Sequence, residues 1–337
     1  MNISVVRTLP DAAWRRFVDE HPASNIFHTP EMFEVFRRAK GYDPELWASV
    51  DGDCRVLALF LPVRVSVQDG LLSYLTTRAV SYGSVLYDPA PDGQAALELL
   101  LRSYRAHSFG RPALFTELRH VADHSTVRPL LDRNGFCHEE HLNYLVDLER
   151  PLEQIWEGVV KPARKAVERS RKRGVTVEEV HDATCLPAVY DLLKLTFSHA
   201  QVPLADPSLF QAALDILVPK GMAQVLLARG DDTPAATTIS LIHRDTMFCW
   251  YIGFDKELHA FYPNDALIWA TLEWGAQHGY RCYDFGGAGT PDKPYGPREF
   301  KAKFGGQLVN YGRAVCVHRP VALAMSRAGY AVYRKRL

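Results

Sequence analysis

The sequence predicts a mixed α/β (α+β) protein made of two related domains, each built around its own mixed sheet. Both halves show the same order of elements: helices, two apolar strands joined by a charged turn, an aromatic strand, a long helix and a strand with an acidic residue near its end. The charged turns are 51–53 and 229–232, and the acids are Glu117 and Asp284. With 337 residues, of which 47% are hydrophobic and 23% charged, the chain is long enough for two domains.

In the first half, apolar residues at helical spacing predict helices over 11–21, where Trp14, Phe17 and Val18 share a face, and over 30–40. Apolar runs bounded by turn residues predict strands, and helical periodicity with Gly135 as a C-cap predicts two further helices. The expected strands are 46–50, 55–67, 71–75, 82–87, 113–118 and 144–148, and the expected helices are 93–107 and 128–134.

In the second half, the same criteria give a comparable series. The expected helices are 152–173, 186–200, 207–217 and 264–279, and the expected strands are 223–229, 235–243, 246–254 and 281–285. A basic amphipathic helix is expected over 320–337. The linker Glu149-Arg150-Pro151 divides the chain into domains 1–148 and 149–337.

Composition narrows the classes of partner and location. The formal net charge is zero, so nothing draws the whole chain towards nucleic acid or an anionic membrane, and such a partner needs a local patch. No apolar stretch is long enough to span a bilayer, and Asp11, Arg15 and Arg16 interrupt any signal-peptide core. We expect a cytoplasmic protein without stable membrane insertion.

The spacing of the cysteines and histidines does not match that of a metal site. The six cysteines form no Cys-x-x-Cys pair, so reduced and mostly buried thiols are expected. The histidine cluster His120, His124, His138 and His141 lacks a His-Glu-x-x-His pattern, and we interpret it as surface and hydrogen-bonded histidines without a metal.

Two neighbouring segments near the end of the chain carry the strongest functional signal. Residues 283–289 (Tyr-Asp-Phe-Gly-Gly-Ala-Gly) are typical of a buried strand entering a glycine turn that a ligand can approach. Residues 299–306 place Lys301 and Lys303 between aromatic residues, ahead of Gly-Gly. A lysine in a partly apolar site can stabilise developing negative charge, whereas an ordinary loop with surface lysines is the alternative.

A basic run and an aromatic cluster add candidate binding residues. Seven of the thirteen residues 161–173 are Lys or Arg, on a helix whose apolar face includes Ala163 and Val167. This helix fits a diphosphate or an RNA backbone, or else it is a solvated face that complements the helix dipole. Trp250, Tyr251 and Phe254 lie around Gly253, and such aromatics either form core or line a cleft.

With these segments in place, the chain resembles the FemABX family of aminoacyl-tRNA-dependent transferases. The resemblance covers nearly the whole chain and is carried by 25–33, by the basic helix 161–175 and, most specifically, by Tyr283-Asp284-Phe285-Gly286-Gly287 with the segment 299–305. It implies a pair of acyl-CoA N-acyltransferase (GNAT)-like domains. The chain has no long heptad segment, so no coiled-coil insertion is expected.

The resemblance also implies a reaction and roles for particular residues. An amine attacks the ester of an aminoacyl-tRNA, which serves as co-substrate, and no further cofactor is needed. Lys301 matches the family's cleft lysine and is the expected catalytic residue, while Arg164 matches an arginine that meets acceptor phosphates. In the first domain Arg37, Arg38 and Lys40 compete for a similar part. The expected substrate-binding residues are Arg164, Lys161, Phe300, Tyr251, Arg37, Lys40 and Tyr295.

The acceptor and the role of Asp284 stay open. The spacing between the two parts of the last motif departs from the cell-wall enzymes, so a peptide or nucleoside natural product, as in antibiotic biosynthesis, is an acceptor class beside a peptidoglycan precursor. Asp284 acts in proton transfer or caps loop amides. Two other functions compete: an acyl-CoA-dependent N-acyltransferase acting on a polysaccharide or peptide amine, and a non-catalytic binding protein. The acyl-CoA-dependent function would need a glycine-rich loop for the CoA pyrophosphate, and the sequence contains no such loop.

Overall fold

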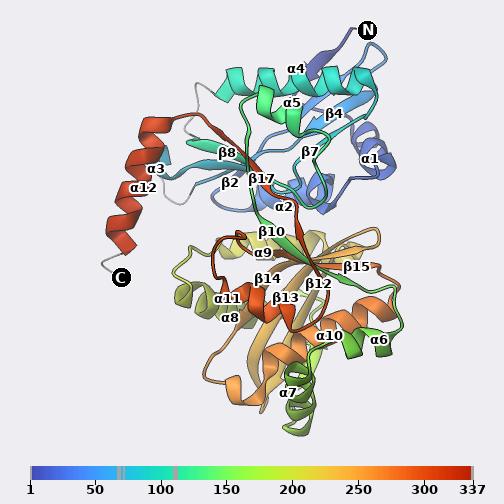
Figure 1. Ribbon diagram of the computed structural model, residues 1–337, viewed down its shortest axis with the longest axis vertical. Coiled ribbons are helices and arrows are strands. Elements are labelled where there is room, and N and C mark those ends of the chain that lie inside the picture. The colour runs from blue at the N-terminus through green and yellow to red at the C-terminus, as the bar shows by residue number, and fades with distance from the viewer. Residues whose placement is uncertain (1, 67–69, 71–72, 109–112, 335–337) are drawn as a thin grey trace. The chain divides into compact units, whose positions relative to one another are not determined.

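The computed structural model describes residues 2–66, 70, 73–108 and 113–334, with side chains described as far as Gly329. The chain divides into two compact units (Figure 1). Unit 1 comprises Met1–Glu140 and Tyr311–Leu337, and unit 2 comprises His141–Asn310.

Unit 1 contains two sheets with helices packed on them. One sheet has the strand order β1-β3-β4-β7 and the other β2-β5-β6-β8-β17-β9. The helices are α1 (Asp11–Glu20), η1 (Ile26–His28), α2 (Pro30–Arg38), α3 (Ser73–Thr76), α4 (Pro91–Ser108), α5 (Arg128–Arg133) and α12 (Pro320–Arg334). The strands are β1 (Ser4–Val6), β2 (Tyr42–Pro44), β3 (Trp47–Val50), β4 (Val56–Phe60), β5 (Val63–Val65), β6 (Arg78–Ser81), β7 (Val85–Tyr87), β8 (Phe115–Arg119), β9 (Cys137–Glu139) and β17 (Arg313–Val317).

The core of unit 1 forms where α4 covers one face of the strands. Leu97, Leu100 and Leu101 of α4 are fully buried against Phe60 and Leu118. In β8, Thr116 and Leu118 point into this core, so Glu117 and Arg119 lie on the opposite face of the sheet.

Unit 2 contains one seven-stranded sheet in the order β11-β12-β13-β14-β15-β10-β16. Its strands are β10 (Leu142–Asp147), β11 (Thr176–Glu179), β12 (Ala223–Gly230), β13 (Thr233–His243), β14 (Thr246–Phe254), β15 (Cys282–Gly287) and β16 (Gln307–Asn310). Its helices are α6 (Leu152–Gly158), α7 (Lys161–Lys172), η3 (Ala183–Cys185), α8 (Leu186–His199), α9 (Pro207–Ile216), η4 (Val218–Lys220), η5 (His259–Phe261), α10 (Pro263–Gln277) and α11 (Gly296–Ala302).

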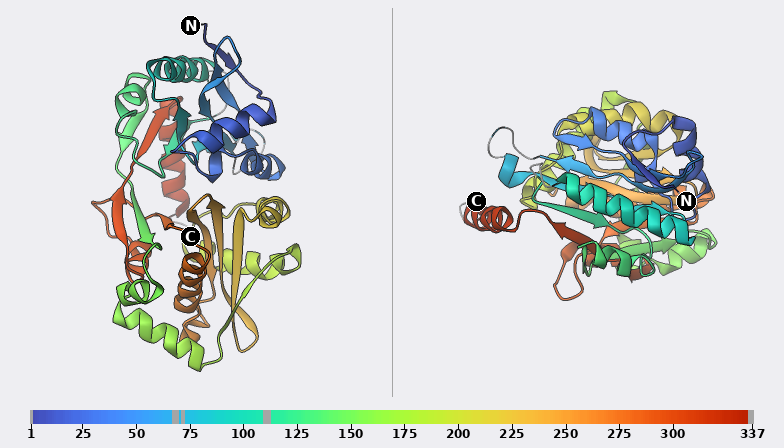
Figure 2. Two further views of the ribbon diagram at one scale, coloured as in Figure 1. Left: turned by 90° about the vertical axis from the view of Figure 1, so that its right-hand side faces the viewer. Right: turned by 90° about the horizontal axis from the view of Figure 1, so that it is seen from above.

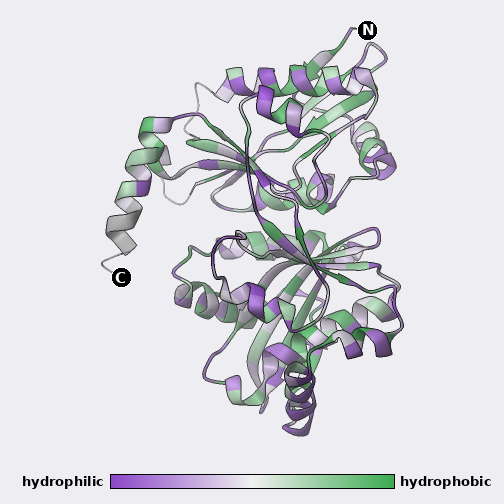
Figure 3. Ribbon diagram, viewed as in Figure 1, coloured by the Kyte–Doolittle hydropathy of each residue, from purple (hydrophilic) through white to green (hydrophobic). Residues whose placement is uncertain are grey.

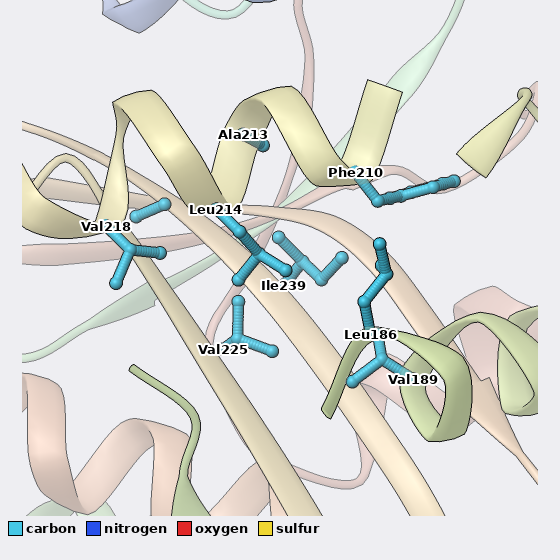
Figure 4. A pocket seen from close by; sticks show the side chains of 9 residues that line it. Leu186, Val189, Phe210, Ala213, Leu214, Val218, Val225 and Ile239 are labelled. Atoms are coloured by element: carbon cyan, nitrogen blue, oxygen red, sulfur yellow. The ribbon is translucent and has the colours of Figure 1, made fainter. Parts of the chain in front are cut away.

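Helices cover both faces of the unit 2 sheet, as Figure 2 shows in its left view. One face packs on α10 through Ile268 and Leu272, and the other packs on α8 and α9 through Leu193 and Phe210. This second layer encloses an apolar cavity of ≈ 10 Å³ lined by Leu186, Val189, Phe210, Ala213, Leu214, Val218, Ala223, Val225 and Ile239 (Figure 4). It has room for about one water molecule and offers no polar partner, so it is a packing gap and not a ligand site.

The observed units cross the predicted division at residues 148 and 149, so each unit contains a strand that the prediction assigned to the other domain. Strand β10 follows the elements of unit 1 along the chain but lies between β15 and β16 of unit 2. Strand β17 follows the elements of unit 2 but lies between β8 and β9 of unit 1. The units are therefore not the continuous segments 1–148 and 149–337 that the linker composition suggested, because strand pairing decides the division.

The order of the long helices and strands agrees with the sequence prediction. The predicted strand 55–67 is two strands of different sheets, β4 and β5, and the short strands β1, β2, β6, β9, β11 and β16 were not predicted. Four further differences concern single elements. The predicted strand 71–75 is wrong for Ser73–Thr76, which form α3, and residues 71–72 lie outside the described residues. A short apolar run does not by itself distinguish a strand from a helix. The predicted helix 152–173 is two helices, since α6 ends at Gly158 and Pro162 occupies the first turn of α7.

The other two differences concern the end of the chain. The helix α11 and the strand β17 were not predicted, although Ala314 and Cys316 alternate with polar or half-exposed residues as a strand requires. The predicted C-terminal helix is present as α12, and Lys335 to Leu337 lie outside the described residues. No helix within the described ranges is long and apolar enough to cross a membrane.

Candidate active site

The candidate active site lies in unit 2 where two parallel strands separate. Strands β14 and β15 pair in parallel from Thr246/Cys282 to Phe248/Asp284, yet β14 continues to Phe254 and β15 to Gly287. Past the last pair, the strands leave a gap in the ladder of main-chain hydrogen bonds. Backbone groups of buried strands need partners, so something else must satisfy them at this point.

The side chain of Lys301 supplies those partners. Its Nζ donates to the carbonyl oxygens of Phe285 and Gly287, each at 2.7 Å, and lies 3.5 Å from the carbonyl oxygen of Gly286. An ammonium has three donors, and two are used in short bonds while the third contact is at the limit for a hydrogen bond. One N–H of Lys301 is therefore weakly engaged at the splayed end of the strands.

Burial changes the pKa of the Lys301 ammonium. Lys301 is 9% exposed, and burial lowers its pKa, an effect opposed by the nearby Asp284 and Cys249 side chains. The carbonyl dipoles hold the ammonium in one place, which is the arrangement that preorganised charge stabilisation requires. The predicted alternative of surface lysines is therefore wrong for Lys301, whereas Lys303 is exposed with its Nζ 5.3 Å from the centre of the Phe300 ring.

Asp284 shapes the turn that presents these carbonyl groups. It is 2% exposed, its carboxylate accepts from the Gly286 N–H at 2.7 Å, and Asn143 Nδ2 lies 3.3 and 3.2 Å from its two oxygens. Burial raises the pKa of Asp284 to about 6, and the hydrogen bonds from Gly286 and Asn143 and the charge of Lys301 oppose that rise. Gly286 has φ +69°, and an added Cβ would lie 3.3 Å from the Phe248 ring, so glycine is needed at the turn.

The helix α11 carries Lys301 together with two other predicted residues. Phe300 is half-buried, with its ring centroid 5.4 Å from that of Phe304. Tyr295 stands at the N-cap of α11 and is 41% exposed. Its ring packs on Gly289, where an added Cβ would meet the ring at 2.9 Å.

The start of the basic helix α7 lies against the end of α11. The Val160 N–H donates to the carbonyl oxygen of Lys303 at 2.8 Å, and Val160 is the N-cap of α7. Lys161 is exposed and Arg164 half-buried in the first turn. The structure thus brings Lys161 and Arg164 onto the element that begins beside α11.

The remaining predicted residues lie elsewhere. Tyr251 of β14 belongs to an aromatic cluster under α8 and α9, with ring centroids 4.8 Å from Phe210 and 5.0 Å from Trp250. Arg37 and Lys40 belong to unit 1. Arg37 donates twice to Glu34, at 2.5 and 2.8 Å, and Arg38 donates to the same carboxylate at 2.7 Å. These bonds lower the pKa of Glu34 to about 2. Lys40 is exposed just after α2.

The N-terminus of α10, which follows strand β14, has an unsuitable charge for binding a pyrophosphate. The segment 255–262 between β14 and α10 contains no glycine, and α10 begins Pro263-Asn264-Asp265. Asp265 puts a carboxyl group in the first turn, and burial raises its pKa. A phosphate at a helix N-terminus needs open amides and positive charge, so this terminus is a poor fit for CoA.

Histidines and cysteines form no metal centre in the part of the chain that the structure describes. Among the histidines expected to be at the surface or hydrogen-bonded, His120 is 4% exposed; its ring stacks on His124 at 4.4 Å and its Nδ1 lies 2.9 Å from Ser84 Oγ. Burial lowers the pKa of His120 to about 3. Of the six free cysteines, Cys249 and Cys316 are buried and Cys54 and Cys137 exposed, so thiols that are mostly buried were a wrong expectation.

Sequence reasoning missed Asn143 as part of the site. It comes from β10, 141 residues away from Asp284 in sequence. Only the pairing of β10 with β15 brings the two side chains together. No local pattern in the sequence carries that information.

Comparisons with known proteins place this geometry in a known fold. The acetyltransferase (GNAT) domain family matches residues 160–301, within unit 2. Among solved structures, FemX superposes with a TM-score of 0.72 at 16% identity, covering 97% of this chain and 100% of FemX. A comparison with curated proteins finds no match.

Two further solved structures show the same architecture. The C-terminal domain of a putative lysylphosphatidylglycerol synthetase from Agrobacterium fabrum has a TM-score of 0.58 at 14% identity, covering 94% of each chain. A tandem GNAT protein from the clavulanic acid biosynthesis pathway has a TM-score of 0.59 at 13% identity, covering 94% of this chain and 99% of that one. The predicted pair of GNAT-like domains is confirmed, and the chain has the fold of FemX, with two GNAT-like domains in tandem.

Proposed function

We propose that this protein is an acyltransferase that moves an amino acid from an aminoacyl-tRNA to an amine and forms an amide. The observation that carries the proposal is the ammonium of Lys301 held at the split between β14 and β15, with the basic helix α7 beginning beside the same helix α11. No cofactor beyond the aminoacyl-tRNA co-substrate is proposed.

The reaction requires that the amine be positioned at the ester and that the negative charge of the tetrahedral intermediate be stabilised. The amine nitrogen attacks the ester carbonyl carbon, the C–N bond forms, and the C–O bond to the ribose oxygen breaks. The amine loses a proton and the ribose hydroxyl gains one. In the tetrahedral intermediate the former carbonyl oxygen carries negative charge, and the weakly engaged N–H of Lys301 is our candidate donor to it.

The helix α7 supplies a surface for the RNA. The cations Lys165, Arg169 and Lys172 of α7 and its C-cap residue Arg173 are exposed, and Figure 3 shows the helix as hydrophilic along most of its length. A chain of zero net charge that concentrates cations on one helix has a local patch for phosphates. Because α7 starts beside α11, RNA bound along it would carry its esterified end near Lys301.

The amine acceptor is assigned to the same unit. Arg164 and Lys161 in the first turn of α7 suit an anionic acceptor, and Phe300 and Tyr295 of the neighbouring α11 region supply apolar surface. Cell-wall precursors and peptide or nucleoside natural products are the proposed acceptor classes. The name of the Agrobacterium relative adds an aminoacylated lipid to these classes. Arg37 in unit 1 already donates two hydrogen bonds to Glu34, which makes it a poor candidate for an acceptor contact.

Two competing functions remain distinguishable. An acyl-CoA-dependent N-acyltransferase is supported by the domain match and disfavoured by Asp265 at the start of α10. A non-catalytic binding protein would retain ligand affinity after loss of Lys301, whereas an enzyme would lose turnover. The buried ammonium argues for the enzyme, because a lysine with little exposure contributes little to a general binding surface.

The test supplies the full chain with bulk tRNA charged with labelled amino acids, an extract of candidate amines and, in parallel, labelled acetyl-CoA. Ribonuclease-sensitive transfer of the amino acid supports the proposal. Transfer from acetyl-CoA alone overturns it in favour of the acyl-CoA reaction. Loss of transfer in Lys301→Ala, with retention in Lys303→Ala, ties the activity to the candidate site.

A further inference from the structure

A second charged site lies in unit 1, on the sheet face opposite α4. Arg119 of β8 and Arg313 of β17 are direct partners in the antiparallel register of the two strands. Like charges directly opposite each other on neighbouring strands repel and destabilise a sheet. Such a pair is an unfavourable choice unless something negative lies between the two guanidiniums.

One carboxylate meets both arginines. Glu117 Oε1 accepts from Arg119 Nε at 2.5 Å and from Arg313 Nη1 at 3.0 Å. The Glu117 side chain is 12% exposed, and the charges of the surrounding arginines outweigh burial and lower its pKa. Glu117 therefore fixes both guanidiniums in place without matching their combined charge.

A third arginine raises the local positive charge. Arg78 of β6 acts electrostatically on both Glu117 and Arg313, and Glu139 lies opposite Arg313 on β9. Glu139 is exposed to solvent, so its charge is screened more than that of Glu117, on which all three arginines act. Burial lowers the pKa of Arg313 to about 10, with repulsion from Arg119 and Arg78 adding to the effect, so Arg313 is still charged at neutral pH.

The arginine side chains are partly shielded from solvent, and an aromatic ring lies beside one of them. The Arg313 and Arg119 side chains are 26% and 30% exposed, so they are partly shielded yet reachable from solvent. The Arg119 guanidinium lies 5.1 Å from the centre of the Tyr82 ring, and Tyr82 stacks on Phe36. An aromatic wall of this kind holds a guanidinium in one orientation and excludes some of the competing water.

We infer that Arg78, Arg119 and Arg313 form a binding site in unit 1 for the oxyanion group, phosphate or carboxylate, of a small molecule, with Glu117 as the positioning residue. Guanidiniums bind both groups through paired N–H donors, and partly shielded positions strengthen such bonds. The inference concerns unit 1 alone and goes beyond the proposed acyl transfer, since it requires neither RNA nor an acyl donor.

The experiment titrates the full chain with inorganic phosphate and, separately, with acetate, by isothermal calorimetry at constant ionic strength in chloride. We expect saturable binding of at least one anion, weakened at least tenfold in Arg313→Gln and in Arg119→Gln. Preference for phosphate assigns the natural ligand to the phosphate class, and preference for acetate assigns it to the carboxylate class. Arg55→Gln, which alters another arginine of unit 1 that is paired with Asp88, is the matched control and should bind as the parent does.

The inference fails if the parent chain binds neither anion above chloride, or if Arg313→Gln binds as tightly as the parent. Circular dichroism checks the fold of each variant. Should the strand variants unfold, Arg78→Gln replaces them, because Arg78 is exposed and its loss leaves the pairing of β8 with β17 intact. A severalfold loss of anion affinity in Arg78→Gln supports the site, and unchanged affinity overturns it.

Discussion

Asn143 and Asp284 meet across the strands β10 and β15, with the Asn143 amide nitrogen 3.3 and 3.2 Å from the two carboxylate oxygens of a side chain that is 2% exposed. The amide comes from the first half of the sequence and the carboxylate from the second. Their contact places the glycine turn after Asp284, and the turn presents the carbonyl groups that hold Lys301. The candidate site depends on this chain of contacts.

Replacing Lys301 tests the centre of the site. Lys301→Ala is expected to lower kcat by about 100-fold or more, the usual effect of losing one donor to an oxyanion. It also leaves the buried carbonyl groups of Phe285 and Gly287 without their donor, which costs roughly 1–3 kcal/mol of stability. Transfer kinetics and chemical denaturation measure the two effects, and Lys303→Ala is the control on the same helix. Near-normal turnover of a folded Lys301→Ala protein would contradict the catalytic role.

The raised pKa of Asp284 makes stability depend on pH. Its pKa of about 6 lies above the unfolded value of 3.8, so the folded state binds a proton more tightly between these values. Stability therefore rises as the pH falls through 6, by about 1 kcal/mol between pH 7 and pH 5 from this group. Denaturant titrations of the parent and of Asp284→Asn at both pH values isolate the effect. An equal pH response in the two proteins would show that Asp284 titrates normally.

Neutralising the exposed side of α7 tests the RNA surface. The double variant Lys165→Gln/Lys172→Gln is expected to raise KM for charged tRNA and to flatten its dependence on salt, with the slope of log KM against log salt falling by about 1 to 2. Initial rates at several salt concentrations give this slope. Lys194→Gln/Lys256→Gln removes two exposed lysines elsewhere in unit 2 and serves as the control. If the two double variants gave equal slopes of log KM against log salt, α7 would have no part in RNA binding.

The exchange of strands predicts which fragments fold. Residues 141–310 contain all seven strands of their sheet, so this fragment is expected to unfold cooperatively on heating. Residues 149–310 lack β10, which lies between β15 and β16, and should not form a stable sheet. Circular dichroism and thermal melts compare the two fragments. A cooperative melt of 149–310 at the same temperature would show that β10 is dispensable.

The small cavity in the second layer of unit 2 allows a stabilising substitution. Val225→Ile adds one methylene to a residue that lines the cavity and is expected to be neutral or to stabilise by about 0.5–1 kcal/mol. Val146→Ile makes the same change at a buried position that does not line the cavity, and it should destabilise by overpacking. The midpoints of denaturant-induced unfolding compare the stability of each variant with that of the parent. A loss of stability in Val225→Ile would show that the cavity cannot accept a methyl group.

Much of the fold could be predicted from local patterns. The helices at 11–20 and 186–199 and the strands from Ala223 to Phe254 follow from apolar spacing and turn residues. The motif made Lys301 the predicted catalytic residue. Its environment was not predictable, because burial and the carbonyl contacts arise where helix α11 packs against a split between two strands whose paired residues are 36 apart in sequence.

The arginine site in unit 1 lay beyond sequence reasoning for a related cause. Arg119 and Arg313 are separated by 194 residues and meet only through the pairing of β8 and β17. The competing candidates Arg37 and Arg38 lie in a basic cluster that is obvious in the sequence, yet both bind Glu34 within the same helix. Local charge density thus drew attention to cations that are already paired.

The placement of β17 also has a consequence for how the protein is made. A ribosome releases the chain from its first residue onwards, and domains usually fold in that order. Here the slot between β8 and β9 stays open until Arg313–Val317 has been synthesised, by which time all of His141–Asn310 exists. The unit that begins first is therefore finished last, and nascent chains halted before residue 313 would expose two unpaired strand edges, which chaperones bind and which aggregate when unprotected.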